Sequence, residues 1–172
     1  MSRNIEIKAR VADKEALTAK AVSIAAQGPI QIAQNDTFFS CESGRLKLRT
    51  FAEGSGELIF YRRANEHGPK ESYYVRSPTA TPGLLRQALA LAYGEIGSVI
   101  KQRTLYLIGR TRLHLDNVEN LGQFLELEVV LGDDEQPESG VREAHDLMRE
   151  LGVAPDQLID CAYIDLLLGR EV

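Results

Sequence analysis

The segment that decides the fold is Asn4-Ile5-Glu6-Ile7-Lys8-Ala9-Arg10-Val11, in which polar and apolar residues alternate without a break. At the two-residue period of a β-strand, the four polar side chains fall on one face and the four apolar side chains on the other. One acid and two bases on the same face are more charge than a solvated strand needs. The same pattern recurs along the chain, so the polar faces of the predicted strands are where we look for function.

The composition favours a single domain spanning residues 1–172. The chain has 172 residues, 44% of them apolar, which suits one sizeable core. No apolar run approaches the roughly 18–20 residues of a membrane span, and the first residues are polar, so we expect neither a membrane partner nor a targeting segment. Cys41 and Cys161 lie far apart without metal-ligand spacing. We expect free thiols and a cytoplasmic protein.

The charge of the chain is unevenly distributed. A net charge of −5 argues against a general nucleic-acid partner, because such domains are usually basic. Basic residues nevertheless crowd the predicted strands, whereas acidic residues crowd the loops and the C-terminal third. This segregation favours a small anionic ligand in a locally basic site.

Turn and capping residues divide the chain into about seven or eight strands and four helices. We predict strands over 3–11, 37–40, 44–51, 57–63, 71–76, 99–108, 111–118 and 123–131, with a loop between Gly28-Pro29 and the second strand. We predict helices over 14–26 behind an Asp13 cap, from Thr81-Pro82 to Tyr93, up to Leu151-Gly152, and over 155–168. Hairpin turns such as Gly109-Arg110 favour an antiparallel sheet and an α+β fold.

The charged faces differ from strand to strand. The middle strands are almost purely basic, whereas carboxylates stand at Glu6, Asp116, Glu126 and Glu128. An open antiparallel sheet with one face in water would also alternate in this way. Like charges on neighbouring strands repel unless an anion lies between them, and four helices need a dry face to cover. We therefore expect the charged faces to close on one another as a barrel.

A barrel interior with these residue types would hold a polyphosphate. Arginine and lysine bind phosphate oxygens, and arginine often does so with two hydrogen bonds. Carboxylates hold a hard divalent cation such as Mg²⁺ or Mn²⁺ that bridges phosphates. Positioning and charge neutralisation of this kind are what phosphoryl-transfer sites require.

Five segments carry a family resemblance: IEIKARV (5–11), GRLKLR (44–49), TRLHLD (111–116), FLELEVVL (124–131) and AYIDLL (162–167). In this order they resemble the motifs of the CYTH superfamily, which comprises class IV (CyaB-type) adenylate cyclases and thiamine triphosphatases, also called triphosphate tunnel metalloenzymes. The resemblance covers nearly the whole chain as a single CYTH domain. It implies a closed eight-stranded antiparallel tunnel with helices outside, a triphosphate such as ATP inside, Mg²⁺ or Mn²⁺, and a homodimer.

The resemblance also implies three overlapping sets of site residues. The metal ligands would be Glu6, Asp116, Glu126 and Glu128. The triphosphate would bind Lys8, Arg45, Lys47, Arg49, Arg63, Lys101, Arg103 and Arg112. The catalytic residues would be Lys8, Arg112 and Asp116.

One residue departs from the family pattern. The family's opening motif is Glu-x-Glu-x-Lys, and the first glutamate is replaced here by Asn4. An amide still offers an oxygen but brings no charge and cannot act as a base. The change bears on a second metal ion or on whatever task that glutamate performs.

Other polar residues receive structural interpretations. We expect His114 to be structural or to support a ligand rather than to act as a base. Tyr163 is expected to pack in the core with its hydroxyl hydrogen-bonded, and His67 and Lys70 to lie in a solvated loop. Three functions stay open: an adenylate cyclase-like enzyme, a triphosphatase acting on inorganic, thiamine or nucleoside triphosphate, and a non-catalytic triphosphate or polyphosphate binder.

Overall fold

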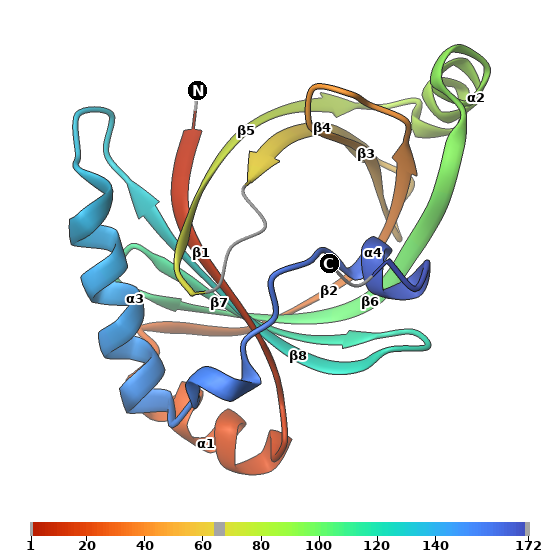
Figure 1. Cartoon of the computed structure of the whole chain (residues 1–172). Helices are drawn as coiled ribbons and strands as arrows, with labels where there is room; N and C mark the ends of the chain where they lie inside the picture. Colours follow the sequence, from red (N-terminus) through yellow and green to blue (C-terminus); the bar gives the residue numbers. More distant parts are fainter. Residues whose placement is uncertain (1, 64–67, 171–172) are drawn as a thin grey trace.

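The computed structural model describes residues 2–63 and 68–170, and within them eight strands form a closed antiparallel barrel (Figure 1). The strands are β1 (Ser2–Arg10), β2 (Gln27–Phe39), β3 (Arg45–Phe51), β4 (Gly56–Arg63), β5 (Lys70–Thr79), β6 (Glu95–Ile108), β7 (Thr111–Val118) and β8 (Gly122–Leu131). The helices are α1 (Lys14–Ile24), α2 (Pro82–Tyr93), α3 (Pro137–Leu151), the 3₁₀ turn η1 (Pro155–Gln157) and α4 (Tyr163–Leu167). Around the barrel the order is β1-β5-β4-β3-β2-β6-β7-β8. The predicted α+β tunnel is confirmed.

The strand β1 closes the barrel because both of its edges are paired. Glu6 stands opposite Lys70 of β5 on one side and opposite Glu128 of β8 on the other. The hairpin from β6 to β7 needs only Gly109 and Arg110, and Gly109 has a φ of 55°, a conformation in which glycine carries no steric penalty. Short turns of this kind keep consecutive strands adjacent in the sheet.

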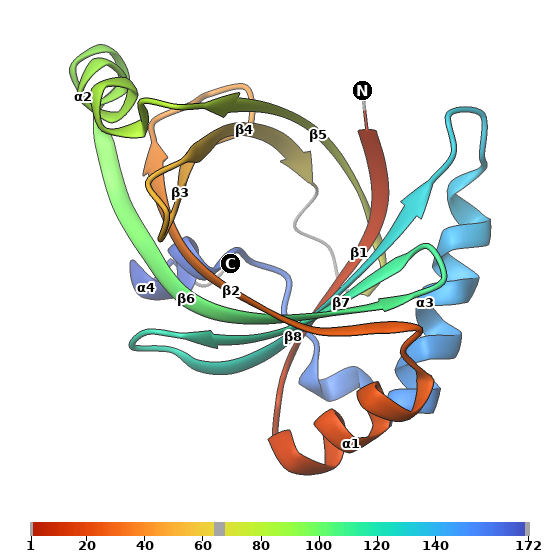
Figure 2. The ribbon, with the colours of Figure 1, turned by 180° about the vertical axis from the view of Figure 1, so that it is seen from behind.

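The apolar faces of the strands point out of the barrel and are covered by helices. Ile5, Ile7 and Leu127 are at most 1% exposed and belong to a core that also contains Leu147 and Met148 of α3. Figure 2 shows α1 and α3 together on this side of the barrel, with α2 at the far corner. Because the dry faces are covered outside, the polar faces have only the barrel interior to occupy.

Two smaller apolar clusters attach the remaining helices. Leu89 of α2 packs with Phe39 and Leu48, and Tyr163 of α4 packs with Phe38 and Phe124. The helix α1 begins as predicted behind Asp13, whose carboxylate accepts a hydrogen bond of 3.0 Å from the Ala16 N–H. It ends two residues before the predicted limit, so that β2 can start at Gln27.

Two sequence predictions are wrong. The segment between Gly28 and Asp36, predicted as a loop, belongs to β2, a strand of 13 residues that pairs with both β3 and β6. The predicted helix over 155–168 is only the 3₁₀ turn η1 and the five-residue α4, separated by an extended stretch. That stretch is extended because Leu158 bridges to Ala9 of β1, and the Ile159 N–H donates to the Lys8 carbonyl at 3.0 Å.

None of the helices in the described ranges combines the length and the apolar character needed to cross a membrane.

Candidate functional site

Inward side chains from all eight strands line a cavity of about 280 Å³ inside the barrel. Ala162 and Tyr163, from the chain that leads into α4, contribute to its wall as well. Among the described residues, the lining contains eight lysine or arginine side chains and five carboxylates. The cavity therefore has an excess of positive charge, although the whole chain has a net charge of −5. Such a field attracts anions.

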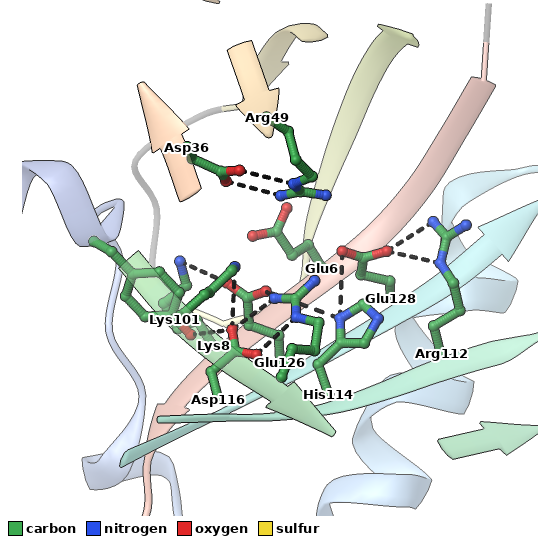
Figure 3. A network of polar contacts seen from close by, with 12 residues as sticks. Glu6, Lys8, Asp36, Arg49, Lys101, Arg112, His114, Asp116, Glu126 and Glu128 are labelled. Atoms are coloured by element: carbon green, nitrogen blue, oxygen red, sulfur yellow. Dashed lines mark hydrogen bonds and ion pairs between the residues drawn. The ribbon is translucent and has the colours of Figure 1, made fainter. Parts of the chain in front are cut away.

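Figure 3 shows Lys8, Lys101, Asp116 and Glu126 in a network of charges, and Arg103 joins the two carboxylates of this network. Its guanidinium donates to both oxygens of Asp116, at 2.7 and 2.6 Å, and also contacts Glu126. Lys8 pairs with the other oxygen of Glu126 at 2.8 Å, and Lys101 lies 3.3 Å from Asp116. Burial alone would raise the pKa of Asp116, but Arg103 and Lys101 outweigh it and hold this pKa below its usual range. The sequence-predicted residues of β1, β6, β7 and β8 are thus brought together.

A group of metal-ligand type lies next to this network. One ligand atom each of His114, Glu126 and Glu128 lies within 4.8 Å of the others. Burial, followed by the charge of Arg103, lowers the pKa of His114 to about 4, so the imidazole is neutral near pH 7. Burial opposes ionisation of Glu128 too, but His114 and Arg112 outweigh it and lower this pKa to about 2. Arg112 donates to Glu128 at 2.8 Å.

These three residues fit a divalent cation. Carboxylate oxygens are ligands for Mg²⁺ and Mn²⁺, and a neutral imidazole can add a nitrogen. The Nδ1 atom of His114 is buried without a hydrogen-bond partner, so of the two roles expected for this residue, support of a ligand fits its surroundings better than a purely structural role. Among the described residues, Glu6 and Asp116 lie outside this group: Glu6 pairs with Arg63, and Asp116 with Lys101 and Arg103.

Asp36 is a prominent polar residue of the cavity that sequence reasoning missed. Its carboxylate accepts from Lys47 at 2.8 Å and from Arg49 at 2.7 and 2.8 Å. Burial opposes its ionisation, but these two cations hold its pKa well below the usual range. Lys47, whose pKa burial lowers to about 8, titrates close to neutrality. Sequence reasoning missed Asp36 because it placed this residue in a loop, and the side chain faces the cavity only because β2 extends through position 36.

Two predicted phosphate ligands, Arg45 and Arg63, differ in whether they line the cavity. Arg45 does not line it, and its guanidinium pairs with Asp165 at 2.7 Å. Arg63 lines the cavity, contacts Glu6, and donates to the Asp160 carbonyl at 3.2 Å. The structure thus places Arg63, but not Arg45, beside the central network.

Four further residues can be compared with their predicted roles. Asn4 lines the cavity, and its buried side-chain oxygen has no hydrogen-bond partner. Tyr163 is buried and donates to Asp116 at 3.0 Å, so its hydroxyl is bonded as expected. Lys70 is wrongly predicted as a solvated loop residue, because it begins β5 and is only 4% exposed. His67 lies outside the described residues.

A closed barrel with a basic interior and one wall of carboxylate and imidazole groups defines an anion-binding β-tunnel protein. More particularly, the chain belongs to the CYTH domain family, whose model matches residues 2–163. It is 23% identical to the adenylate cyclase CyaB of Aeromonas hydrophila over 167 residues, which are 92% of this chain and 85% of that protein.

Solved structures share the fold. The PH1012 protein of Pyrococcus horikoshii superimposes with a TM-score of 0.84 at 26% identity, covering 95% of this chain and 98% of that one. HpAC1 of Hippeastrum, a putative adenylyl cyclase described as having a dominant triphosphatase activity, gives a TM-score of 0.69 at 15% identity over 98% and 97% of the two chains. The second likeness is one of fold alone.

Proposed function

We propose that this protein is a divalent-metal-dependent enzyme that acts on a triphosphate held inside the tunnel. The observation that carries the proposal is the excess of lysine and arginine in a cavity inside the barrel with a group of metal-ligand type on its wall. An anion with several charges can satisfy many buried cations at once, and a triphosphate has that charge and an extended shape. Membership of the CYTH domain family agrees with this reading.

The roles we propose follow the positions of the side chains. Lys47 and Arg49 of β3 and Lys101 and Arg103 of β6, the two strands that flank β2, would bind phosphate oxygens, together with Lys8, Arg63 and Arg112. Glu126 and Glu128 would hold Mg²⁺ or Mn²⁺ with His114, and Glu6 and Asp116 stand nearby as further carboxylates. When bound, the metal would neutralise phosphate charge and polarise the reacting phosphorus.

The first candidate reaction is that of an adenylate cyclase. The ribose 3′-oxygen of ATP bonds to the α-phosphorus, the bond from that phosphorus to the bridging oxygen breaks, and pyrophosphate leaves as the hydroxyl proton is lost. The relative from Aeromonas hydrophila, matched over most of both chains, favours this candidate. We take Lys8, Arg112 and Asp116 as the residues that would orient the reacting groups.

Two alternatives use the same cavity. A triphosphatase would need the same cradle and metal, with water in place of the ribose hydroxyl as the attacking group. A binder without activity is favoured by Asn4, because its amide supplies neither charge nor a base at the position that the family resemblance gives to glutamate. In that case the triphosphate would bind and leave unchanged.

Phosphorus NMR separates these functions. The purified protein is offered ATP and inorganic triphosphate separately, each with Mg²⁺ or Mn²⁺. Cyclic AMP with pyrophosphate supports the cyclase, orthophosphate supports the triphosphatase, and binding of both without turnover supports the binder. Failure to bind either compound contradicts the proposal as a whole.

Matched variants connect the result to the site. Glu126→Gln and Glu128→Gln should abolish metal-dependent turnover, because each removes a charged ligand from the group on the wall. Glu95→Gln is the control, since this carboxylate pairs with Arg86 on the outside of the barrel. Turnover that survives in both site variants would contradict the metal assignment.

A further inference from the structure

The segment that follows η1 leads to Ala162 and Tyr163, which contribute to the wall of the cavity. The segment is tied to the barrel through the main chain of Lys8 itself, which accepts the Ile159 N–H at 3.0 Å. Arg63 and Lys70 both donate to the Asp160 carbonyl, each at 3.2 Å. In Figure 1 this stretch runs across the barrel toward α4. Tyr163, the first residue of α4, is thereby fixed relative to β1.

The side chain of Tyr163 contacts three charged groups from three different strands. The Lys8 ammonium lies 3.8 Å from the centre of its ring, and the Lys101 ammonium lies 5.1 Å from it. Its hydroxyl donates to Asp116 at 3.0 Å. The ring is also held from the side by Phe124, with 4.9 Å between ring centres. Only 5% of Tyr163 is exposed, so these contacts are shielded from water.

The position of the ring next to two ammonium groups indicates a role beyond core packing. A lysine has a long flexible side chain, and holding its ammonium in one place costs rotamer entropy. The attraction between a cation and a desolvated aromatic face offsets that cost. Lys8 pairs with Glu126 and Lys101 pairs with Asp116, and the Tyr163 ring lies next to both ammonium groups.

We propose that Tyr163 is a positioning residue for triphosphate binding, whose ring holds the ammonium groups of Lys8 and Lys101 where they meet the phosphate. The role rests on the proposed function, because it presumes a triphosphate in the tunnel. Tyr163 acts through the two lysines. Removing the ring should therefore weaken binding mainly when the lysine it holds is present.

A double-mutant cycle tests this coupling. Binding of inorganic triphosphate without metal is measured by calorimetry for the wild type, Tyr163→Met, Lys8→Met and the double variant. Methionine fills space without an aromatic face. We expect Tyr163→Met to weaken binding about tenfold in the wild type, or ~1.4 kcal/mol, but no more than about threefold in the Lys8→Met background. Tyr163→Phe keeps the ring and should bind within about twofold of the wild type.

A merely structural role gives a different result. Tyr163→Met would then lower the free energy of unfolding but leave the affinity of the folded protein unchanged, or its effect would add to that of Lys8→Met. Either outcome overturns the proposal. A wild type that binds no triphosphate would instead refute the proposed function.

A second measurement needs no disruptive variant. In ¹³C-lysine-labelled protein, the ε-methylene protons of Lys8, identified as the signal lost in Lys8→Met, should be shifted upfield by the ring in both the wild type and Tyr163→Phe. An unshifted signal overturns the proposal even if Tyr163→Met does not fold.

Discussion

Replacing Asp36 with asparagine tests how the tunnel balances its buried charges. The carboxylate is 2% exposed and accepts three charge-assisted hydrogen bonds from Lys47 and Arg49. Removing one partner of a buried ion pair costs roughly 3–5 kcal/mol. The amide keeps one acceptor oxygen, so we expect the free energy of unfolding to fall by about 3 kcal/mol. For a chain of this size that corresponds to a melting temperature lower by about 6–12 °C.

The assay is thermal unfolding with and without inorganic triphosphate. Asp36→Asn leaves two buried cations without their carboxylate, so the variant should bind triphosphate about tenfold more tightly and gain more stability from it than the wild type does. Asp146→Asn is the control, because Asp146 forms an exposed pair with Arg149 and should change stability by less than ~1 kcal/mol.

The stability difference between the wild type and Asp36→Asn should also change with pH in a defined direction. The folded-state pKa of Asp36 is lowered, so its contribution is present above the ordinary aspartate pKa of about 4. It is lost as the pH falls from there through the folded-state value. The difference between the wild type and Asp36→Asn should therefore shrink in acid. An Asp36→Asn variant as stable as the Asp146→Asn control, or one that binds triphosphate more weakly than the wild type, would refute the reasoning.

Three other changes have defined outcomes. Lys47 has a pKa of about 8, and a bound anion raises this pKa. Triphosphate binding at pH 8 should therefore take up about half a proton more in the wild type than in Lys47→Arg, and this difference should vanish near pH 6. Calorimetry in buffers of different ionisation enthalpy measures the proton uptake, and equal uptake in the two proteins would exclude Lys47 from the site. His114→Ala should weaken Mn²⁺ binding about tenfold in electron paramagnetic resonance titrations, whereas unchanged affinity would remove the imidazole from the metal group. Asn4→Glu restores the glutamate of the family motif and should raise metal-dependent turnover if the absence of this carboxylate limits activity. Unchanged turnover would mean that this chain does not need a carboxylate at position 4.

The barrel could be predicted where each strand has one charged and one apolar face. Leu125, Leu127 and Val129 alternate with Glu126 and Glu128, and the structure buries the three apolar residues outside the tunnel, as that pattern requires. The strand β2 gives no such signal, because Gln34 and Asp36 face inward while Asn35 lies on the opposite face. Aspartate and asparagine are poor strand formers. Only tertiary pairing with Lys47 and Arg49 makes Asp36 a favourable interior residue.

Other parts of the site depend on segments that are distant in the sequence. The contact between Tyr163 and Lys8 joins residues at opposite ends of the chain, and periodicity says nothing about such a distance. The prediction of one C-terminal helix failed for the same reason, since Leu158 bridges to Ala9 of β1 and the Ile159 N–H donates to the Lys8 carbonyl. The family resemblance supplied the charged residues of the tunnel but not the way in which they pair with one another.

The double pairing of β1 also governs when the tunnel can exist during synthesis. A ribosome produces β1 first of the eight strands, yet one of its two partners, β8, is the last of them. Until residues 122–131 emerge, β1 lacks the neighbouring strand that carries Glu126 and Glu128, and the barrel cannot close. The candidate site is therefore completed only late in synthesis. Pairing between strands so far apart in the sequence is slow to form. One edge of β1 therefore stays unpaired for most of translation.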